Sequence, residues 1–486
     1  MKRENKADYS SKALGYAILP DINATPNTLY YTASTTKAFT AISLLSVLER
    51  NSSISRGLSL DSRLIDIIGA DFAMPEDYGT LHSTLRDVLS HRLGFPACDL
   101  SYGGPNFTAQ DAVRSLRYLP MVSEFRSDFN YLNLGYMTIQ HVIQTLTGKW
   151  IGDVHQETIW DPLDMTATSI RLQDALSKST PEGVLAHGYS WDPLTKSLGQ
   201  QPWTDTLLVG GGGVISSVND YAKFLRAMLE KQLSLSSDAQ SRLIHPIVLE
   251  GGSTPFGNMT DMLYSMGWEI SSYRGHNLVM HTGKITGFSA IVAFLPDLDW
   301  GTVLFCNGDN NGAQALKAVF LRFLDDFLEI PAELREDVIP AMDIANNKSV
   351  VSYRNTRASL YPSLPSPLLP PSLPLSAYEG TYHNPGFRNI SFALAKPLET
   401  TPVANTTASV LHSVWRRVVN TTIDLEHVSG ETFIAWVDTE VPAPLLRVGL
   451  PAEFRLGPSG RVTTLGFSAD PSLIALDEKV WFEKLD

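Results

Sequence analysis

A dense run of prolines near residue 370 constrains the fold of this chain more than any other feature. Proline fixes φ and lacks a backbone N–H, so such a run excludes both a helix and a central strand. Between residues 361 and 375 the prolines are Pro362, Pro365, Pro367, Pro370, Pro371 and Pro374. This segment therefore predicts an extended linker between two separately folded parts of the 486-residue chain.

The two sides of this linker differ in their patterns. Upstream, apolar residues at helical spacing mix with strand-like apolar runs, which predicts an α/β domain. Helices are expected at residues 36–50, 218–229 and 315–327, and strands at 279–281, 288–295 and 301–307. Downstream, short β-rich runs broken by Gly, Pro and Asn predict a small all-β domain, with strands at 432–437, 445–448, 462–467 and 480–482. We expect a domain at 1–350, a linker at 351–375 and a β domain at 376–486.

Composition excludes several classes of function. The chain has 38 basic and 51 acidic residues and a net charge of −13. Proteins that bind the phosphate backbone of nucleic acids present a basic face, so this composition excludes a general nucleic-acid-binding protein. No apolar run reaches the roughly 20 residues of a transmembrane helix. The two cysteines, Cys98 and Cys306, provide neither a disulfide framework nor a Cys-based zinc site, and whether they pair stays open. We predict neither a metal nor a cofactor.

The N-terminus gives a weak indication of cellular location. Residues 1–8 are polar and lack the apolar core of a signal peptide, so none is expected in this chain. Asn-x-Ser/Thr sequons, which hint that relatives are secreted, occur at Asn23, Asn51, Asn106, Asn258, Asn347, Asn389, Asn405 and Asn420. The location and the oligomeric state stay open.

One serine in the chain, Ser34, has a lysine three residues later, at Lys37. Both stand at the start of an expected helix, one turn apart on the same face. Burial and the positive end of a helix both favour a neutral lysine, which can take the proton of a serine hydroxyl. The N–H of Ser34 there can face a developing oxyanion. An isolated Ser-x-x-Lys is also typical of a plain helix cap beside a solvated lysine.

Two further motifs carry groups suited to the same chemistry. A phenol such as Tyr131 can relay a proton to a leaving group, and the amide of Asn133 can bond both a lysine and a substrate carbonyl. His281, Thr282, Gly283 and Lys284 follow a strand-like run. There the glycine allows close approach of a substrate, and the N–H of Lys284 offers an oxyanion donor. Taken singly, the motifs also fit a packed aromatic beside a turn and a β-turn with a structural histidine.

The order of these motifs resembles the serine β-lactamase and penicillin-binding-protein superfamily, closest to its class C β-lactamase-like branch of esterases, D-aminopeptidases and transesterases. The resemblance covers roughly residues 9–327, and the tail beginning at residues 378–382 is similar to a lipocalin-like domain. Further landmarks in the same order lie at residues 84–91, 94–96, 162–168, 211–220 and 264–268. The implied fold is an antiparallel sheet flanked by helices with a helical lobe, followed by a barrel-like β domain.

The resemblance also implies roles for the site residues. Ser34 is the acylated nucleophile, Lys37 its general base, and Tyr131 a partner in proton transfer. Asn133 orients Lys37 and the substrate. The N–H groups of Ser34 and Lys284 form the oxyanion hole.

This chain departs from its relatives in three places. Residues 1–8 do not supply the first strand of the family, so the sheet is expected to lack it. His281 stands where penicillin-recognising members carry a lysine, which disfavours a β-lactam carboxylate and favours neutral esters, thioesters or amides. Lys284 replaces a small residue and is expected to crowd or charge the acyl pocket.

Three functions remain open at this stage. The first is a serine hydrolase that transfers the acyl group of a small-molecule substrate to water. The second is a transesterase with an alcohol as acceptor. The third is a vestigial binding protein on the same scaffold.

Overall fold

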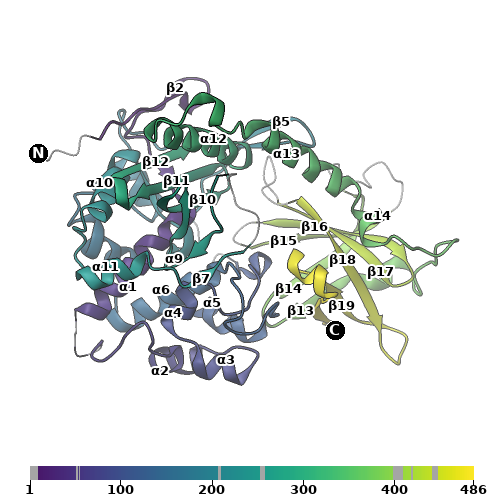
Figure 1. Ribbon diagram of the computed structural model, residues 1–486. Coiled ribbons are helices and arrows are strands. Elements are labelled where there is room, and N and C mark those ends of the chain that lie inside the picture. Colours follow the sequence, from purple (N-terminus) through teal and green to yellow (C-terminus); the bar gives the residue numbers. More distant parts are fainter. Residues whose placement is uncertain are drawn as a thin grey trace, which may run out of the picture. The chain divides into compact units, whose positions relative to one another are not determined.

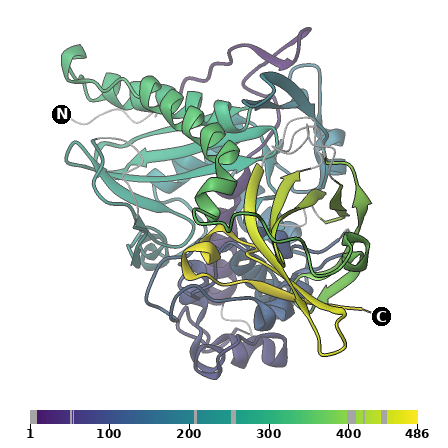
Figure 2. The same ribbon diagram turned by 90° about the vertical axis from the view of Figure 1, so that its right-hand side faces the viewer.

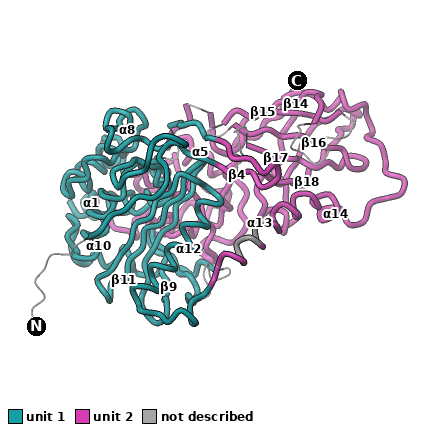
Figure 3. The backbone as a smooth tube through the Cα atoms, turned by 90° about the horizontal axis from the view of Figure 1, so that it is seen from above, with its two compact units in different colours: residues 1–58, 143–189, 200–336 teal, residues 59–142, 190–199, 337–486 magenta. Residues whose placement is uncertain are grey.

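The computed structural model describes residues 9–50, 53, 55–104, 106–205, 209–251, 258–397, 409–417, 420–439 and 447–485. The chain forms two compact units, coloured separately in Figure 3. The first comprises residues 1–58, 143–189 and 200–336, and the second comprises residues 59–142, 190–199 and 337–486. Three elements cross from one unit to the other: α6 (Asn133–Thr147), β4 (Gly188–Asp192) and β5 (Ser197–Gln201).

The first unit is built on a six-stranded antiparallel sheet with the strand order β12-β11-β10-β9-β8-β7 (Figure 1). Its strands are β7 (Val248–Leu249), β8 (Leu263–Tyr264), β9 (Glu269–Tyr273), β10 (His276–Ile285), β11 (Phe288–Leu295) and β12 (Trp300–Cys306). Every residue of β11 is buried, because this strand has partners on both sides and packed layers on both faces.

Helices cover both faces of this sheet. The helices of the first unit are α1 (Thr36–Glu49), α7 (Ile151–His155), α8 (Leu172–Lys178), α9 (Val209–Gly212), α10 (Val218–Leu229), α11 (Ser237–Leu243) and α12 (Asn310–Phe327). Trp300 stacks on Phe327 of α12, whereas the next residue, Gly301, meets Leu225 of α10. Because successive strand residues point to opposite faces, α10 and α12 lie on opposite sides of the sheet.

Helix α1 is almost entirely buried. Twelve of its fourteen residues are buried, and most are small or apolar, as expected for a helix packed on every side. Small strands complete the unit: β1 (Tyr16–Ile18), β2 (Ile22–Asn23), β3 (Tyr30–Tyr31) and β6 (Ile215–Ser216). All the helices and strands expected upstream of the proline run are confirmed.

The second unit contains a helical lobe. Its helices are α2 (Leu64–Ile68), α3 (Asp77–His82), α4 (Leu85–Leu89), α5 (Ala109–Ser115) and the beginning of α6. Capping boxes start two of them, since Thr84 pairs with Asp87 and Thr108 with Asp111. The Asp87 carboxylate also binds Arg92 and Arg126, which ties the lobe together.

The same unit contains a closed eight-stranded barrel with its strands in sequence order (Figure 2). They are β13 (Gly380–Asn384), β14 (Arg388–Ala395), β15 (Val410–Trp415), β16 (Thr421–Ser429), β17 (Thr432–Thr439), β18 (Arg447–Leu456), β19 (Val462–Phe467) and β20 (Val480–Lys484). Stacked Phe467 and Phe482 belong to its aromatic core. The predicted fold class, an α/β domain followed by a barrel-like β domain, is confirmed.

The proline run carries no helix or strand until the short turn η8 (Leu375–Tyr378). It nevertheless packs along the β16–β17 hairpin, where the Tyr361 hydroxyl donates to the carbonyl of Phe433 at 2.8 Å and the N–H of Ser372 donates to Glu431 at 2.9 Å. Helices α13 (Ile339–Arg354) and α14 (Thr356–Leu360) extend into the range expected as linker. The three domain boundaries stay a prediction.

Three further expectations concern the N-terminus, the two cysteines and membrane-spanning helices. Residues 1–8 lie outside the described residues, so the expected lack of a first strand stays a prediction; β12 is the edge strand of the described sheet. Cys98 and Cys306 are free thiols. No helix in the described part of the chain is long and apolar enough to span a membrane.

Candidate active site

Ser34 lies on a sharp turn that leads into α1. The preceding residue, Ala33, has φ of 49°, a left-handed conformation that is costly for a residue with a side chain. A 3₁₀ turn, η1 (Ala33–Thr35), then continues directly into α1. This geometry presents the half-exposed Ser34 at the start of a buried helix.

Lys37 is fully buried one turn further on. Its Nζ donates a hydrogen bond of 2.7 Å to the carbonyl of Gly211 and lies 3.2 Å from the Oγ of Ser34. The predicted proximity of Ser34 and Lys37 is thus present in the structure. The carbonyl that holds the lysine comes from α9, in the glycine-rich segment that the sequence singled out as a landmark.

Polar contacts fix the segment around Ser34. The hydroxyl of Tyr221 on α10 donates to Thr32 at 2.7 Å and lies 2.9 Å from the hydroxyl of Thr35. Thr40 donates to the carbonyl of Gly210 at 2.7 Å. Buried polar groups with partners rigidify their surroundings, so Ser34 is held between the sheet, α9 and α10.

Strand β10 approaches this turn very closely at Gly283. A Cβ atom on Gly283 would lie 2.4 Å from the carbonyl oxygen of Thr32 and 3.3 Å from the Cβ of Ala33. Only glycine permits this approach. The residue therefore sets the distance between the end of β10 and the turn that carries Ser34.

His281 is buried and neutral. Its Nδ1 lies 2.6 Å from the carbonyl of Thr282, so Nδ1 is the donor, and Nε2 accepts from the hydroxyl of Tyr264 at 3.1 Å. Burial, and next the nearby charge of Lys37, lower the pKa of His281 to about 3. The position that carries a lysine in penicillin-recognising relatives therefore carries no charge at neutral pH.

The end of β10 has an open edge. Residues 276–280 pair with β9, whereas residues 281–285 pair with β11 and have no strand on their other side among the described residues. The N–H of Thr282 bonds to the carboxyl group of Glu269, the residue at the start of β9, so this N–H faces the open edge. Backbone N–H groups alternate along a strand, so the N–H of Lys284 faces the same edge.

Glu269 is a residue of the site that the sequence did not indicate. Its carboxyl group accepts from both the N–H and the hydroxyl of Thr282. Burial, followed by the neighbouring charge of Glu250, raises its pKa to about 8, while Lys317 and Thr282 act in the opposite direction. No local motif marks this residue, because its contact with Thr282 depends on the register between β9 and β10.

The side chain of Lys284 lies on the face of β10 opposite the turn that carries Ser34. It is exposed and donates to Asn310, the first residue of α12, at 3.1 Å. The alternation of side chains sends Lys284 and Thr282 to one face of β10 and His281 and Gly283 to the other. The Lys284 side chain thus points away from the turn that carries Ser34, and its effect on the acyl pocket stays a prediction.

Tyr131 and Asn133 belong to the second unit. The Tyr131 ring packs on His91 with centroids 4.5 Å apart, and the ring of His91 accepts from the N–H of Leu132 at 3.0 Å. The Asn133 side chain bonds to the hydroxyl of Tyr102. The proximity of Tyr131 and Asn133 to Ser34 stays a prediction.

A buried loop supports Asn133 from within the same unit. Tyr102 donates to Asp99, and the N–H of the neighbouring Cys98 donates to Asp470 of the barrel at 3.1 Å. The barrel thereby holds the loop that contacts Asn133. Sequence reasoning missed this support, because Cys98 and Asp470 are far apart in the chain.

Comparisons with known proteins agree with this architecture. The sequence profile of the family described as beta-lactamase matches residues 9–325, and a domain of unknown function, DUF3471, matches residues 365–484. The octameric penicillin-binding protein homologue from Pyrococcus abyssi superposes with a TM-score of 0.57 at 20% identity, over 97% of this chain and 92% of the other. This likeness shows the fold.

Two fungal relatives are more similar in sequence. Unguisins hydrolase ungD of Aspergillus violaceofuscus is 34% identical over 508 residues, which cover 97% of this chain and 85% of the relative. Unguisins hydrolase ungD' of Aspergillus campestris is 32% identical over 485 residues, which cover 98% and 86%. The chain therefore belongs to the beta-lactamase family and is a serine hydrolase.

Proposed function

We propose that this chain forms an acyl-enzyme on Ser34 and transfers the acyl group to water. The observation that carries the proposal is the buried Nζ of Lys37, 3.2 Å from the Oγ of Ser34. In the proposed reaction Lys37 takes the hydroxyl proton while Oγ bonds to the acyl carbon. Collapse of the oxyanion expels the leaving group, which takes up a proton. Water then attacks the ester carbon, releases the acid and restores Ser34.

The remaining site residues have supporting roles in this proposal. The N–H groups of Ser34 and Lys284 stabilise the oxyanion, in keeping with the open edge that the Lys284 N–H faces. Tyr131 shares the transfer of the proton to the leaving group, and Asn133 orients Lys37 and the substrate. The acyl donor lies along the open edge of β10 as an added strand beside Thr282 and Gly283.

The charges at this edge favour an uncharged acyl donor. His281 is neutral, and the carboxyl group of Glu269 already occupies the donors of Thr282. Of the described residues at this edge, neither His281 nor Thr282 offers a substrate carboxylate a cation or a free hydroxyl. We infer that the substrates are esters, thioesters or amides without a free carboxylate at this position, and the two Aspergillus relatives make an unguisin the first compound to test.

The experiment compares the parent with Ser34→Ala on p-nitrophenyl esters and on an unguisin, with products identified by mass spectrometry. Ser241→Ala, on the exposed surface of α11, is the matched control. We expect turnover to fall at least about 10³-fold in Ser34→Ala alone. Equal turnover in Ser34→Ala and the parent contradicts the proposal. Added alcohols separate a hydrolase from a transesterase, because an ester product in place of the acid identifies the transesterase.

A further inference from the structure

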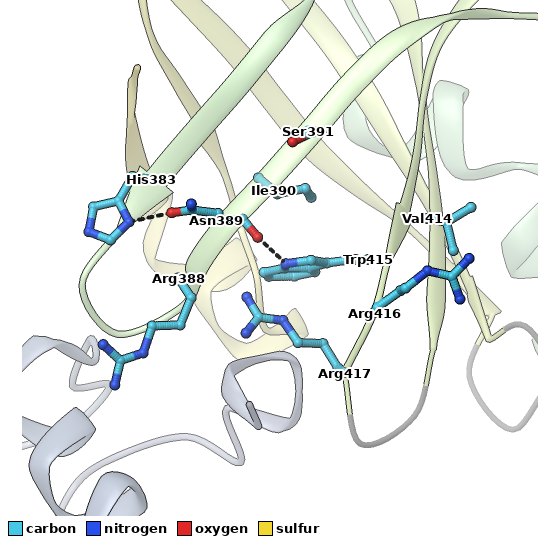
Figure 4. A pocket seen from close by; sticks show the side chains of 9 residues that line it. All are labelled: His383, Arg388, Asn389, Ile390, Ser391, Val414, Trp415, Arg416 and Arg417. Carbon is cyan, nitrogen blue, oxygen red and sulfur yellow. Dashed lines mark hydrogen bonds between the residues drawn. The ribbon is translucent and has the colours of Figure 1, made fainter. Parts of the chain in front are cut away.

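The barrel carries a pocket of about 520 Å³ where the beginning of β14 lies beside the end of β15 (Figure 4). Its polar lining includes His383, Arg388, Asn389, Trp415, Arg416 and Arg417. Arg388 at the start of β14 and Arg417 just after β15 extend to the same side of the pocket, whereas Arg416 points away from them (Figure 4). The proposed acyl-transfer reaction does not use this pocket.

Among the described residues, Arg388 and Arg417 lack the acidic partners that Arg447 of the same unit has. Arg447 binds Asp192 at 2.8 Å and Asp438 at 3.0 Å. By contrast, no Asp or Glu lines the pocket, and no carboxylate in the described part of the chain forms an ion pair with Arg388 or Arg417. This is a local excess of positive charge on a chain whose net charge is −13.

Arg417 is the more deeply placed of the two. Its guanidinium packs over the Trp415 ring, 4.4 Å from the centroid, and donates to the carbonyl of Phe387. Its Nε is buried and has no hydrogen-bond partner among the described residues. Burial, and next the like charge of Arg388, lower the pKa of Arg417 to about 10. A half-buried guanidinium that has an unused donor and a second cation beside it raises the free energy of the folded state. An anion bound between the two cations offsets this cost.

The floor of the pocket is held in place by hydrogen bonds. The indole N–H of Trp415 donates to the carbonyl of Asn389 at 2.8 Å, and Nδ1 of His383 donates to the Asn389 side chain at 2.6 Å (Figure 4). The strands that carry these residues are neighbours in a closed barrel. The floor beside the two guanidinium groups is therefore rigid, which lowers the entropy cost of binding a ligand.

We propose that this pocket binds a small oxyanion, a carboxylate or a phosphate, between Arg388 and Arg417. Planar guanidinium groups pair with both kinds of anion through two parallel hydrogen bonds. The ligand supplies the negative charge that the pocket lacks.

The test is thermal unfolding of the full chain during titration with sodium phosphate or sodium malonate, with sodium chloride at equal ionic strength as reference. We expect at least one of the two anions to raise Tm saturably by a few degrees above the chloride reference. The anion that acts, phosphate or malonate, identifies the kind of ligand. Arg388→Gln and Arg417→Gln are expected to abolish the rise.

Arg461→Gln, an exposed arginine between β18 and β19, is the matched control and is expected to respond like the parent. Because Arg388 is exposed, its variant tests the proposal even if Arg417→Gln does not fold. Two results overturn the proposal: neither anion raises Tm beyond chloride, or Arg388→Gln responds like the parent.

Discussion

Lys37 in the first unit and Arg417 in the barrel are both basic side chains drawn away from solvent, but their surroundings differ. Lys37 is wholly buried, and its Nζ has the carbonyl of Gly211 and the hydroxyl of Ser34 as partners. Among the described residues, Arg417 has one carbonyl partner, an unused buried Nε and a second cation, Arg388, nearby.

The two regions differ in how far the fold alone arranges them for a ligand. The groups around Lys37 are provided by the fold, so the serine and its base are arranged before any substrate arrives. The described groups around Arg417 provide no negative charge to balance it, so we infer that a bound anion provides this charge. Substitutions at the first region should therefore change catalysis, and substitutions at the second should change the response to anions.

The largest effect is expected at Lys37. Lys37→Met keeps the length and apolar part of the side chain but removes the base, so kcat/KM should fall at least about 10³-fold. Steady-state assays on an activated ester measure this, with the exposed Lys12→Met as control. A variant that keeps more than a tenth of the parent activity shows that the lysine is not the base.

The next largest effect is expected at Gly283, where the added Cβ of Gly283→Ala lies 2.4 Å from the carbonyl oxygen of Thr32. Relief of this contact moves β10 away from Ser34, so kcat/KM should fall about 10²-fold and stability by about 1–3 kcal/mol. Urea unfolding and ester hydrolysis measure both. The control is Gly104→Ala, which has open space around its Cβ. Unchanged kinetics show that this approach is not needed for catalysis.

A smaller, pH-dependent effect is expected at Glu269. Its carboxyl group ionises near 4.5 when unfolded, and the raised pKa of about 8 means that the folded state keeps the proton between these values. The folded state then binds more protons than the unfolded state, so this group lowers stability as pH rises from about 4.5 to about 8. Glu269→Gln resembles the protonated form and should lose less stability over this range.

Urea unfolding at pH 5, 7 and 9 tests this expectation, with the exposed Glu333→Gln as control. Parallel pH profiles for the parent and Glu269→Gln contradict it. The same variant keeps an acceptor for Thr282, so ester hydrolysis at pH 6 should change little.

The smallest effect is expected at Arg388. Arg388→Gln removes the like charge beside Arg417, so without phosphate or carboxylate Tm should rise by about 1 °C at low ionic strength, and the gain should vanish at high salt. Calorimetry in a zwitterionic buffer measures this, and Arg461→Gln should show no such gain. A decrease in Tm for Arg388→Gln shows that the two cations do not repel each other.

The sequence predicted several of the elements and the local part of the site. The proximity of Ser34 and Lys37 follows from their spacing along the chain and is present. The strand expected up to His281 is also present, but β10 continues to Ile285 and includes Gly283. The alternating pattern likewise predicted β19 with its bounds, Val462–Phe467.

The remaining features depend on contacts between distant segments. The left-handed Ala33 has no signature, because alanine rarely takes that conformation. Glu269 reaches Thr282 only through the β9–β10 register, and Arg388 meets Arg417 only through the pairing of β14 with β15. Alternation predicts strands in the tail but not their closure into a barrel, which depends on the pairing of β13 with β20.

Labelling of the full chain with a fluorophosphonate, followed by intact-mass and peptide mass spectrometry, tests the central claim most directly. The probe forms a stable bond to an activated serine oxygen. We expect one adduct per chain on Ser34, none in Ser34→Ala and much slower labelling in Lys37→Met. A folded sample without an adduct, or with the adduct on another residue, contradicts the claim that Ser34 is the nucleophile.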